Sequence, residues 1–199
     1  MDKTECDAFV AMMEAQGSLV LRTTDFMVFL DRKQYYLGRC FVWASRHDCK
    51  SFFDMTENEW HQLRRVTAMM EAAYRATFRP DIINVAFLGN EAQHLHAHLV
   101  PRYKTPPQFE GMDWRDEAWG KNYSQQCARG PAAGGRKIDF TGPADRWLFN
   151  KIRDTLVQAL AQDGATQSSL RILCSDDTDQ SSAKKKRKTE KQDDEPPSC

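Results

Sequence analysis

His94-Leu95-His96-Ala97-His98-Leu99-Val100 alternates polar and apolar residues with a period of two. Because successive side chains of a β-strand point to opposite faces of a sheet, this alternation predicts a strand with three histidines on one face. The intervening apolar residues are expected to point into a core, and Pro101 is expected to end the strand. Imidazole can act near neutral pH as a nucleophile, acid, base or metal ligand, so the histidine row indicates a chemical role for this face.

Distances limit what this histidine row can do. At a rise of about 3.3 Å per residue, neighbouring histidines of the row are about 6–7 Å apart at Cα and the outer two about 13 Å apart. Zinc binds histidine nitrogen at about 2.0–2.1 Å, so two neighbours could share one ion but all three could not. Catalysis, a two-histidine metal site, and ordinary surface or core histidines remain as alternatives.

The histidine stretch resembles the motif of the histidine triad family, and Pro101-Arg102-Tyr103 follows it as it often does in that family. Upstream, segments 26–38 and 43–47 resemble the two strands and the turn that precede the family's long helix. Downstream, segment 109–123 resembles one found in some branches. The resemblance covers residues 18–123 and implies an α+β fold, in which an antiparallel sheet of about five strands carries a long helix.

The sequence predicts four regions along the chain. Residues 1–17 form an N-terminal helix, 18–123 the histidine triad domain, 124–174 a C-terminal extension with a helix at about 143–163, and 175–199 a disordered charged tail. Strands are expected at 18–22, 25–30, 39–44, 82–88 and 94–100, with a short further strand at 168–174. Thr56-Glu-Asn-Glu59 is a capping box that opens the long helix. The helices are expected to lie on one side of the sheet.

The family resemblance assigns roles to the three histidines. It implies that His96 attacks a phosphorus atom bearing a nucleoside and forms a covalent nucleotidyl-histidine, which water then cleaves. A nucleophilic imidazole must be neutral with one nitrogen protonated, so a backbone carbonyl that accepts from that nitrogen would hold the tautomer. His98 is expected to hydrogen-bond the phosphate or to protonate the leaving oxygen, and His94 is expected to position its neighbours.

Substrate contacts are also implied by the resemblance. Asp31 matches the family position that holds the ribose hydroxyls, and Leu30 is expected to line the base pocket. Gly89 and Asn90 lie in the loop before the triad, where the family presents phosphate contacts. Asn84 either supplies a polar contact or simply lies on its strand.

The cysteines do not form a metal-binding pattern by themselves. The chain has six cysteines without a Cys-x-x-Cys pair, which is typical of scattered reduced thiols. Some relatives carry a structural zinc held by two N-terminal cysteines and two histidines, but here Cys6 has Phe9 where the second cysteine is expected. His47 and His94 then either retain the histidine half of such a site or are structural histidines. We expect no metal and no cofactor.

The last residues carry a concentrated charge pattern. Lys184-Lys-Lys-Arg-Lys188 is a basic run between acidic stretches in a segment without aromatic residues. Such a run predicts contact with a nuclear import receptor, with a nucleic-acid patch or a plain solvated tail as alternatives. The acidic flanks compete for the same charges and weaken the nucleic-acid interpretation.

Composition and the first residues favour a soluble protein of the cytoplasm and nucleus. The formal net charge is zero, so no overall basic excess indicates a polyanionic partner. The N-terminus lacks the order of a signal peptide, and no apolar run approaches about 20 residues, so no membrane association is expected. The family resemblance further implies a homodimer.

These observations predict a histidine triad hydrolase that acts on a nucleoside phosphoramidate, a dinucleoside polyphosphate or a related adenylyl conjugate. An alternative of another class is a catalytically weak nucleotide-binding regulatory module in a nuclear complex. A DNA-end deadenylase is a weaker alternative, because that branch adds a zinc finger after the triad and no histidine follows His98 here.

Overall fold

The computed structural model describes residues 1–89, 92–123, 132–133, 136–137, 140 and 142–162. In chain order, the helices and strands are α1 (Lys3–Ala15), β1 (Leu19–Arg22), β2 (Phe26–Leu30), β3 (Cys40–Ala44), the 3₁₀ turn η1 (Phe52–Asp54), α2 (Glu57–Thr77), β4 (Ile82–Ala86), β5 (His96–Arg102), β6 (Gln108–Phe109), β7 (Met112–Asp113), β8 (Ala132–Ala133), β9 (Arg136–Lys137) and α4 (Pro143–Gln162). The strand expected at 168–174 and the disordered tail expected at 175–199 lie outside the described residues.

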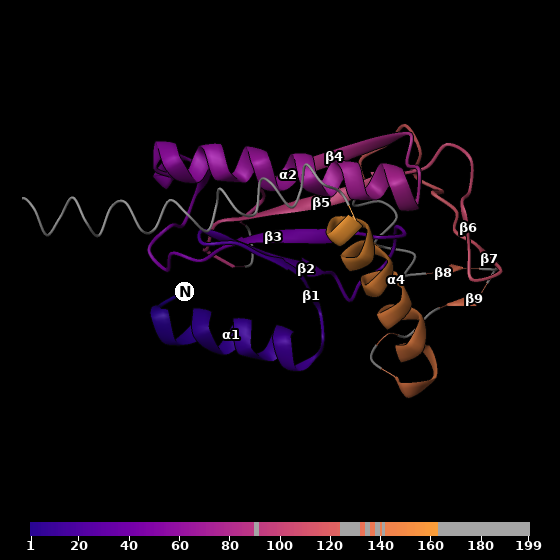
Figure 1. The fold of residues 1–199 in the computed structure, drawn as a ribbon, viewed down its shortest axis with the longest axis horizontal. Coiled ribbons are helices and arrows are strands. Elements are labelled where there is room, and N and C mark those ends of the chain that lie inside the picture. The colour runs from indigo at the N-terminus through magenta and orange to yellow at the C-terminus, as the bar shows by residue number, and fades with distance from the viewer. Residues whose placement is uncertain (90–91, 124–131, 134–135, 138–139, 141, 163–199) are drawn as a thin grey trace, which may run out of the picture.

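Within the described part of the chain, five strands form one antiparallel sheet in the order β1-β2-β3-β5-β4. The strand that carries the histidines, β5, therefore has a neighbour on each side, and β4 is an edge strand. The long helix α2 lies over one face of the sheet and α1 lies over the other (Figure 1). Helix α4 packs against α2 and β1. The predicted α+β fold, with its antiparallel sheet and long helix, is confirmed.

Both faces of the sheet are apolar and both are covered. The larger core lies between the sheet and helices α2 and α4; among its members are Val28, Leu30, Val42, Ala97, Leu99, Leu63, Val66, Met70, Leu148, Ile152 and Leu156. The second core lies on the opposite face, and its buried members are Cys6, Met13, Met27, Phe29, Phe41 and Trp43. The expectation that the helices lie on one side is therefore wrong. Every residue of β2 and β3 is buried, so each face of these strands needs a cover.

Short polar motifs begin the first two helices. In α1, the Asp2 side chain accepts from the Glu5 backbone N–H and the Glu5 carboxylate accepts from the Asp2 backbone N–H. Thr56 and Glu59 form the same reciprocal arrangement at the start of α2, as the sequence predicted. Each box satisfies backbone donors that a helix start would otherwise leave unpaired.

Helix α4 also holds the far end of α1. Arg146 donates to the carbonyl of Gln16, and Arg153 Nη1 donates to the carbonyl of Gly17 at 2.7 Å. Gly17 has a positive φ of 64°, the left-handed conformation in which glycine commonly ends a helix. Two guanidinium groups thus face the carbonyl end of α1, where the helix dipole favours positive charge.

The histidine strand differs from its predicted bounds. It begins at His96 and continues through Pro101 to Arg102, so the expectation that the proline ends the strand is wrong. Pairing with β3 stops at Leu99, whereas pairing with β4 continues to Arg102. Pro101 thus has a strand neighbour on one side only, a position where a missing backbone N–H is tolerated.

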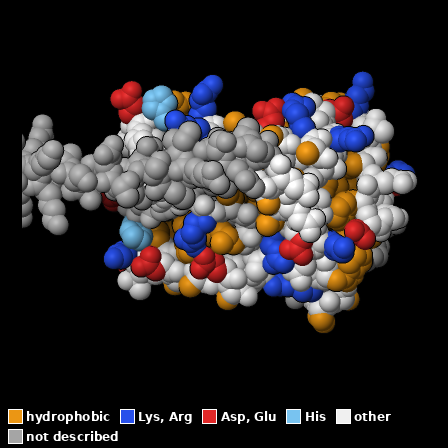
Figure 2. All heavy atoms as spheres, viewed as in Figure 1, with side chains coloured by type: hydrophobic (Ala, Val, Ile, Leu, Met, Phe, Trp, Pro, Cys, Tyr) orange, Lys and Arg blue, Asp and Glu red, His pale blue; other side chains and the backbone are white. Residues whose placement is uncertain are grey.

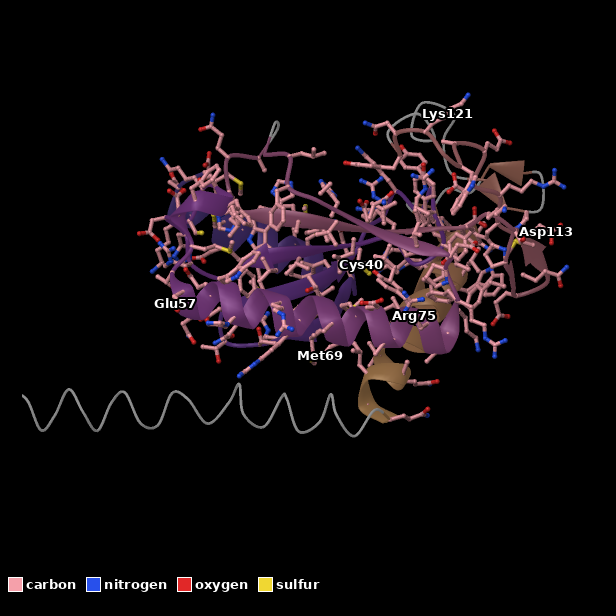
Figure 3. All side chains as sticks on the ribbon, turned by 90° about the horizontal axis from the view of Figure 1, so that it is seen from above. Cys40, Glu57, Met69, Arg75, Asp113 and Lys121 are labelled. Atoms are coloured by element: carbon pink, nitrogen blue, oxygen red, sulfur yellow. The ribbon has the colours of Figure 1, made fainter. Side chains whose placement is uncertain are left out.

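The segment after β5 is held by a buried arginine. The Arg102 guanidinium donates to Asp116 at 2.6 and 3.1 Å and to the carbonyls of Ala118 and Lys121 at 2.6 and 3.2 Å. Both charged side chains of this ion pair are almost fully buried. Figure 3 places Asp113 and Lys121 at the end of the molecule where α2 carries Arg75, opposite the end marked by Glu57. Segment 103–123 therefore packs against one end of the domain as an ordered excursion.

The surface carries charges of both signs. Figure 2 shows acidic and basic side chains interspersed over the face seen in Figure 1, without a large area of one sign. This mixture agrees with the formal net charge of zero. No helix in the described ranges combines the length and apolar character needed to cross a bilayer.

Candidate active site

The strand register places the catalytic candidates on the face covered by α1. His96 lies opposite Trp43 of β3, and His98 lies opposite Phe41 on the same strand. His94 comes just before β5, and its ring is buried on the same face. The apolar residues between the histidines point into the core on the α2 side, as the alternation predicted; they are Leu95, Ala97 and Leu99.

His94 is held by a hydrogen bond at each ring nitrogen. Its Nε2 lies 2.8 Å from the carbonyl oxygen of Ala44, so Nε2 must carry the proton and donate. Its Nδ1 then accepts from the Cys6 thiol, with Sγ 3.5 Å away. Burial lowers the pKa of His94 and raises the pKa of Cys6. The ring is therefore a neutral structural group, with no nitrogen left for a ligand.

His96 has the tautomer that a nucleophile needs. Its Nδ1 lies 2.8 Å from the backbone carbonyl oxygen of His94. Since that oxygen can only accept, Nδ1 carries the proton and the Nε2 lone pair is free. The sequence predicted such a carbonyl, and the structure identifies it as that of His94. The backbone carbonyl of His94 thus orients the His96 ring.

His98 is a neutral imidazole beside His96. The two ring centroids are 5.1 Å apart, with an interplanar angle of 84°. Burial is the largest cause that lowers the pKa of His98, to about 4, followed by the charges of Arg39 and His96. In the described structure its Nδ1 is buried without a hydrogen-bond partner, so Nε2 is the nitrogen that can meet a ligand. At neutral pH this residue is suited to hydrogen-bond a phosphate oxygen rather than to act as a strong acid.

An indole ring packs against two of the histidines. The Trp43 ring centroid lies 4.2 Å from that of His94 and 5.7 Å from that of His96, with interplanar angles of 24° and 27°. Phe9 of α1 stacks on Trp43 at 4.4 Å. Sequence analysis missed this role of Trp43, although its period-two spacing from Phe41 places both on one face of β3.

Asp31 lies at the end of β2 in a buried ion pair that the sequence did not predict. Its Oδ2 is 3.1 Å from Nε of Arg39, and its Oδ1 accepts from the backbone N–H of Lys33 at 2.8 Å. The guanidinium of Arg39 also lies 5.7 Å from the ring centroid of Tyr35 and 5.9 Å from that of Tyr123. The signal in the sequence that could have identified Arg39 is its charge at the start of an otherwise apolar strand. Its position two residues before Phe41 puts it on the histidine face.

The sequence matches the profile of the HIT domain over residues 12–105. The match contains the whole sheet and α2, and it includes all three histidines. Residues 12–105 form a histidine triad domain. A domain of this kind supports nucleotide-binding hydrolase or transferase activity in general.

Several solved histidine triad structures are similar to this chain. A Hit-like protein involved in cell-cycle regulation from Bartonella henselae is 13% identical, with a TM-score of 0.49 over 76% of this chain and 94% of that one. A zinc-bound histidine triad family protein from Mycobacterium smegmatis is 16% identical, with a TM-score of 0.45 over 78% and 96%. A histidine triad protein from Bradyrhizobium japonicum is 17% identical, with a TM-score of 0.46 over 72% and 94%. Comparison with curated protein sequences finds no match.

The predicted substrate residues of the triad domain lie in different places. Leu30 is fully buried in the core on the α2 side, so the structure does not bring it to the histidine face. Asn84 pairs with Val100 on the histidine face, and its Oδ1 accepts from Arg102 at 3.2 Å. Gly89 has a positive φ of 61° and follows β4 in the direction of the triad. Asn90 lies outside the described residues.

The zinc ligands of some relatives are only partly present in this triad domain. Cys6 and His94 contact one another, whereas His47 Nε2 lies 3.0 Å from Oδ1 of Asp7. Over the described ranges, no three His, Cys, Asp or Glu side chains are grouped so that they could hold a metal ion. Phe9 supplies an aromatic contact to Trp43 instead of a thiolate. The residues present do not fit the four-ligand zinc site.

Proposed function

We propose that this protein is a hydrolase that cleaves a nucleoside phosphoramidate, a dinucleoside polyphosphate or a related adenylyl conjugate through a covalent nucleotidyl-histidine. The observation that carries the proposal is the hydrogen bond from His96 Nδ1 to the His94 carbonyl at 2.8 Å. This bond orients the ring and leaves Nε2 as the unprotonated nitrogen. A strand with neighbours on both sides holds the group in place.

In the first step, the lone pair of His96 Nε2 attacks the phosphorus that bears the nucleoside. The bond from phosphorus to the leaving group breaks, and its electron pair departs with the leaving group; an amine leaving group takes up a proton from water as it departs. His98, neutral because its pKa is lowered to about 4, donates a hydrogen bond from Nε2 to a phosphate oxygen. Charge that develops on that oxygen in the transition state is stabilised by a group already in position.

In the second step, water attacks the same phosphorus and the N–P bond breaks. The bonding pair returns to His96 Nε2, and the water proton leaves with the nucleotide product or passes to solvent. Through both steps Nδ1 keeps its proton and its hydrogen bond to the His94 carbonyl. The ring therefore returns to the starting tautomer without a rearrangement of the strand.

Asp31 is the proposed ribose contact. Its carboxylate is partly occupied by Arg39 and by the Lys33 backbone, but each carboxylate oxygen has a second lone pair for a ribose hydroxyl. Asp31→Asn should weaken ribonucleotide binding about 10-fold, because hydrogen bonds to a charged group contribute about 1.5–3 kcal/mol. Binding of the 2′,3′-dideoxy analogue should change little. Equal losses for both sugars would show a purely structural role in the turn.

Rapid quenching tests the covalent step directly. The full-length enzyme is mixed with an α-³²P-labelled adenylyl phosphoramidate and quenched in base at millisecond intervals. We expect label on the wild-type protein that is stable in base and lost in acid, as a phosphorus–nitrogen bond requires. His96→Ala should trap none while it still binds AMP. Turnover without trapped label in the wild type, at every quench time, would contradict the proposal.

The alternative is a nucleotide-binding regulatory module with little catalysis. The same experiment separates the two, since a module of this kind binds AMP but neither traps label nor releases the leaving group. A screen of adenylylated compounds by released AMP then identifies the preferred leaving group among the active cases.

We propose that a second copy of this chain pairs along β4. This strand is an edge of the described sheet, and Ile82 and Val85 on it and Leu88 just after it are each nearly half exposed. An uncovered apolar edge favours pairing with another strand. Val85→Lys should convert a dimer to a monomer in light scattering, whereas Val157→Lys on α4 should not. A monomeric wild type at micromolar concentration would contradict the pairing.

We propose that the run at 184–188 gives the protein access to the nucleus from the cytoplasm. The proposal depends on five consecutive basic residues, which an import receptor binds as a unit. Replacement of all five by glutamine should abolish nuclear enrichment of a fluorescent fusion and leave turnover unchanged. The control variant replaces the same number of exposed lysines and arginines elsewhere in the chain by glutamine. Unaltered localisation of the glutamine variant would disprove the import function.

A further inference from the structure

Trp43 makes a contact with the nucleophile that the mechanism above does not use. It lies directly across the β3–β5 pair from His96, and the two rings stack at an interplanar angle of 27° with centroids 5.7 Å apart. The same indole stacks on His94 at 4.2 Å. The Trp43 indole therefore contacts both the ring that attacks in the proposed reaction and the residue whose carbonyl orients it.

The surroundings of this indole exclude water. Trp43 is 3% exposed, and Phe9 of α1 stacks on it at 4.4 Å. Phe41 approaches with its edge at 6.3 Å. The second core is thus richest in aromatic rings at the point where it meets the histidines. An attraction between a cation and an aromatic face is stronger when water is excluded from the site.

The charge of the His96 ring changes during the proposed reaction. Before attack the ring is neutral, with its only proton on Nδ1. When Nε2 forms its bond to phosphorus, that proton stays on Nδ1, so the ring becomes an imidazolium that carries one positive charge. Hydrolysis of the N–P bond returns the electron pair to Nε2 and restores the neutral ring. The cation exists only in the intermediate and, in part, in the transition states on either side of it.

We propose that Trp43 is a positioning residue that stabilises the nucleotidyl-imidazolium form of His96 through the electron-rich face of its indole. The proposal rests on the covalent step of the proposed function. An interaction that strengthens as the ring gains charge lowers the barrier to attack, and it contributes little to binding of the intact substrate. Its centroid separation lies within the range of about 6 Å in which such contacts are effective.

Two substitutions separate the electronic effect from packing. Trp43→Phe keeps an aromatic face and Trp43→Leu removes it, while both shorten the side chain. With the adenylyl phosphoramidate probe, the rate at which label appears on the protein should fall about 3-fold for Phe and about 10–30-fold for Leu. The Kd for AMP should stay within about 2-fold of wild type in each. Trp147→Leu, a half-exposed tryptophan on α4, is the control that should change neither quantity.

Fluorinated tryptophan tests the same idea without a change of shape. Fluorine withdraws charge from the ring face, so 5-fluoro- and 5,6-difluorotryptophan incorporated at all tryptophans should lower the labelling rate stepwise. The matched control is the Trp43→Phe protein grown with the same amino acids, in which fluorination should have no effect. This control assigns the response to one ring among the five tryptophans of the chain.

The outcomes distinguish this inference from the proposed function. A wild type that traps label, combined with equal losses for Phe and Leu or with no response to fluorination, would overturn the role of Trp43 and leave the covalent mechanism standing. A wild type that traps no label would overturn both. The expected result is a labelling rate that falls stepwise with fluorination in the wild type and does not change with fluorination in Trp43→Phe.

Discussion

On the face covered by α2 and α4, the sheet contributes mainly aliphatic side chains to a continuous core, among them Val28, Val42 and Leu99. On the face covered by α1, the same strands contribute aromatic rings and imidazoles, and the buried polar contacts are made with Cys6 and with backbone carbonyls. Alternate residues of single strands supply both faces. One strand can therefore be selected for stability through one set of positions and for chemistry through the other.

The difference predicts how each face responds to mutation. Aliphatic positions contribute transfer free energy, which depends on volume and on the cavity that a truncation leaves. Positions on the histidine face determine the tautomer, the orientation and the charge of the imidazole rings, and these properties depend on individual atoms. Substitutions on the first face should change the free energy of unfolding, and those on the second should change rates.

The largest expected effect is on the histidine face. His96→Ala removes the nucleophilic nitrogen, and turnover of an adenylyl phosphoramidate should fall by about 10⁴-fold or more. The ring is only partly buried, so the melting temperature should change by no more than a few degrees. His98→Ala, which removes a hydrogen-bond donor, should cost about 10²–10⁴-fold. Wild-type turnover in the His96 variant would contradict the assignment of chemistry to the histidine face.

The next effect is on the aliphatic face. Ile152→Ala in α4 should lower the free energy of unfolding by about 2–5 kcal/mol, because Ile152 is fully buried against α2 and the sheet. At a temperature where the variant is folded, kcat should stay within about 2-fold of wild type. Val157→Ala, on the exposed side of the same helix, should change stability by less than about 0.5 kcal/mol. A large loss of kcat in folded Ile152→Ala would show that the two faces are coupled.

The third effect is a pH dependence of stability that belongs to the histidine face. The pKa of His98 is lowered to about 4 in the folded protein, so the unfolded chain binds more protons between pH 4 and the ordinary histidine value of about 6.5. Stability should therefore rise with pH across this window and fall as pH is lowered through it. Because His98 is partly exposed, the contribution is about 1–2 kcal/mol.

Urea unfolding at pH 4.5 and 7 measures this contribution. His98→Gln should flatten the dependence, and His61→Gln, on the exposed surface of α2, should not. If both variants keep the wild-type slope, the neutral state of His98 is not maintained by its surroundings.

The smallest effect concerns the hydrogen bond that joins α4, on one side of the sheet, to the end of α1, on the other. Arg153 of α4 donates to the Gly17 carbonyl at the end of α1, so Arg153→Ala should lower the free energy of unfolding by about 1 kcal/mol. Hydrogen exchange should increase in α1 more than in α2. Arg64→Ala, an exposed arginine on α2, is the control. Equal changes in exchange for the two helices would indicate a general loss of stability without a specific link.

Features that depend on neighbouring residues were predictable from the sequence. The period-two alternation determined that the histidines share a face and that Leu95, Ala97 and Leu99 enter a core, because side-chain direction in a strand is a local property. The capping box at Thr56 and Glu59 determined where α2 begins, since its hydrogen bonds span three residues. The helix expected at about 143–163 follows from apolar spacing and matches α4.

Features that depend on which segments meet were decided by the tertiary structure alone. Strand order places Trp43 opposite His96, buries Leu30 away from the site and leaves Pro101 without a β3 partner. The burial of β2 and β3 on both faces brings α1 to the histidine side and its cysteine to His94. The sequence determined the residue types and their local direction, whereas pairing between distant segments decided which charges, rings and carbonyls surround His96, because such pairing is set by packing of the whole chain.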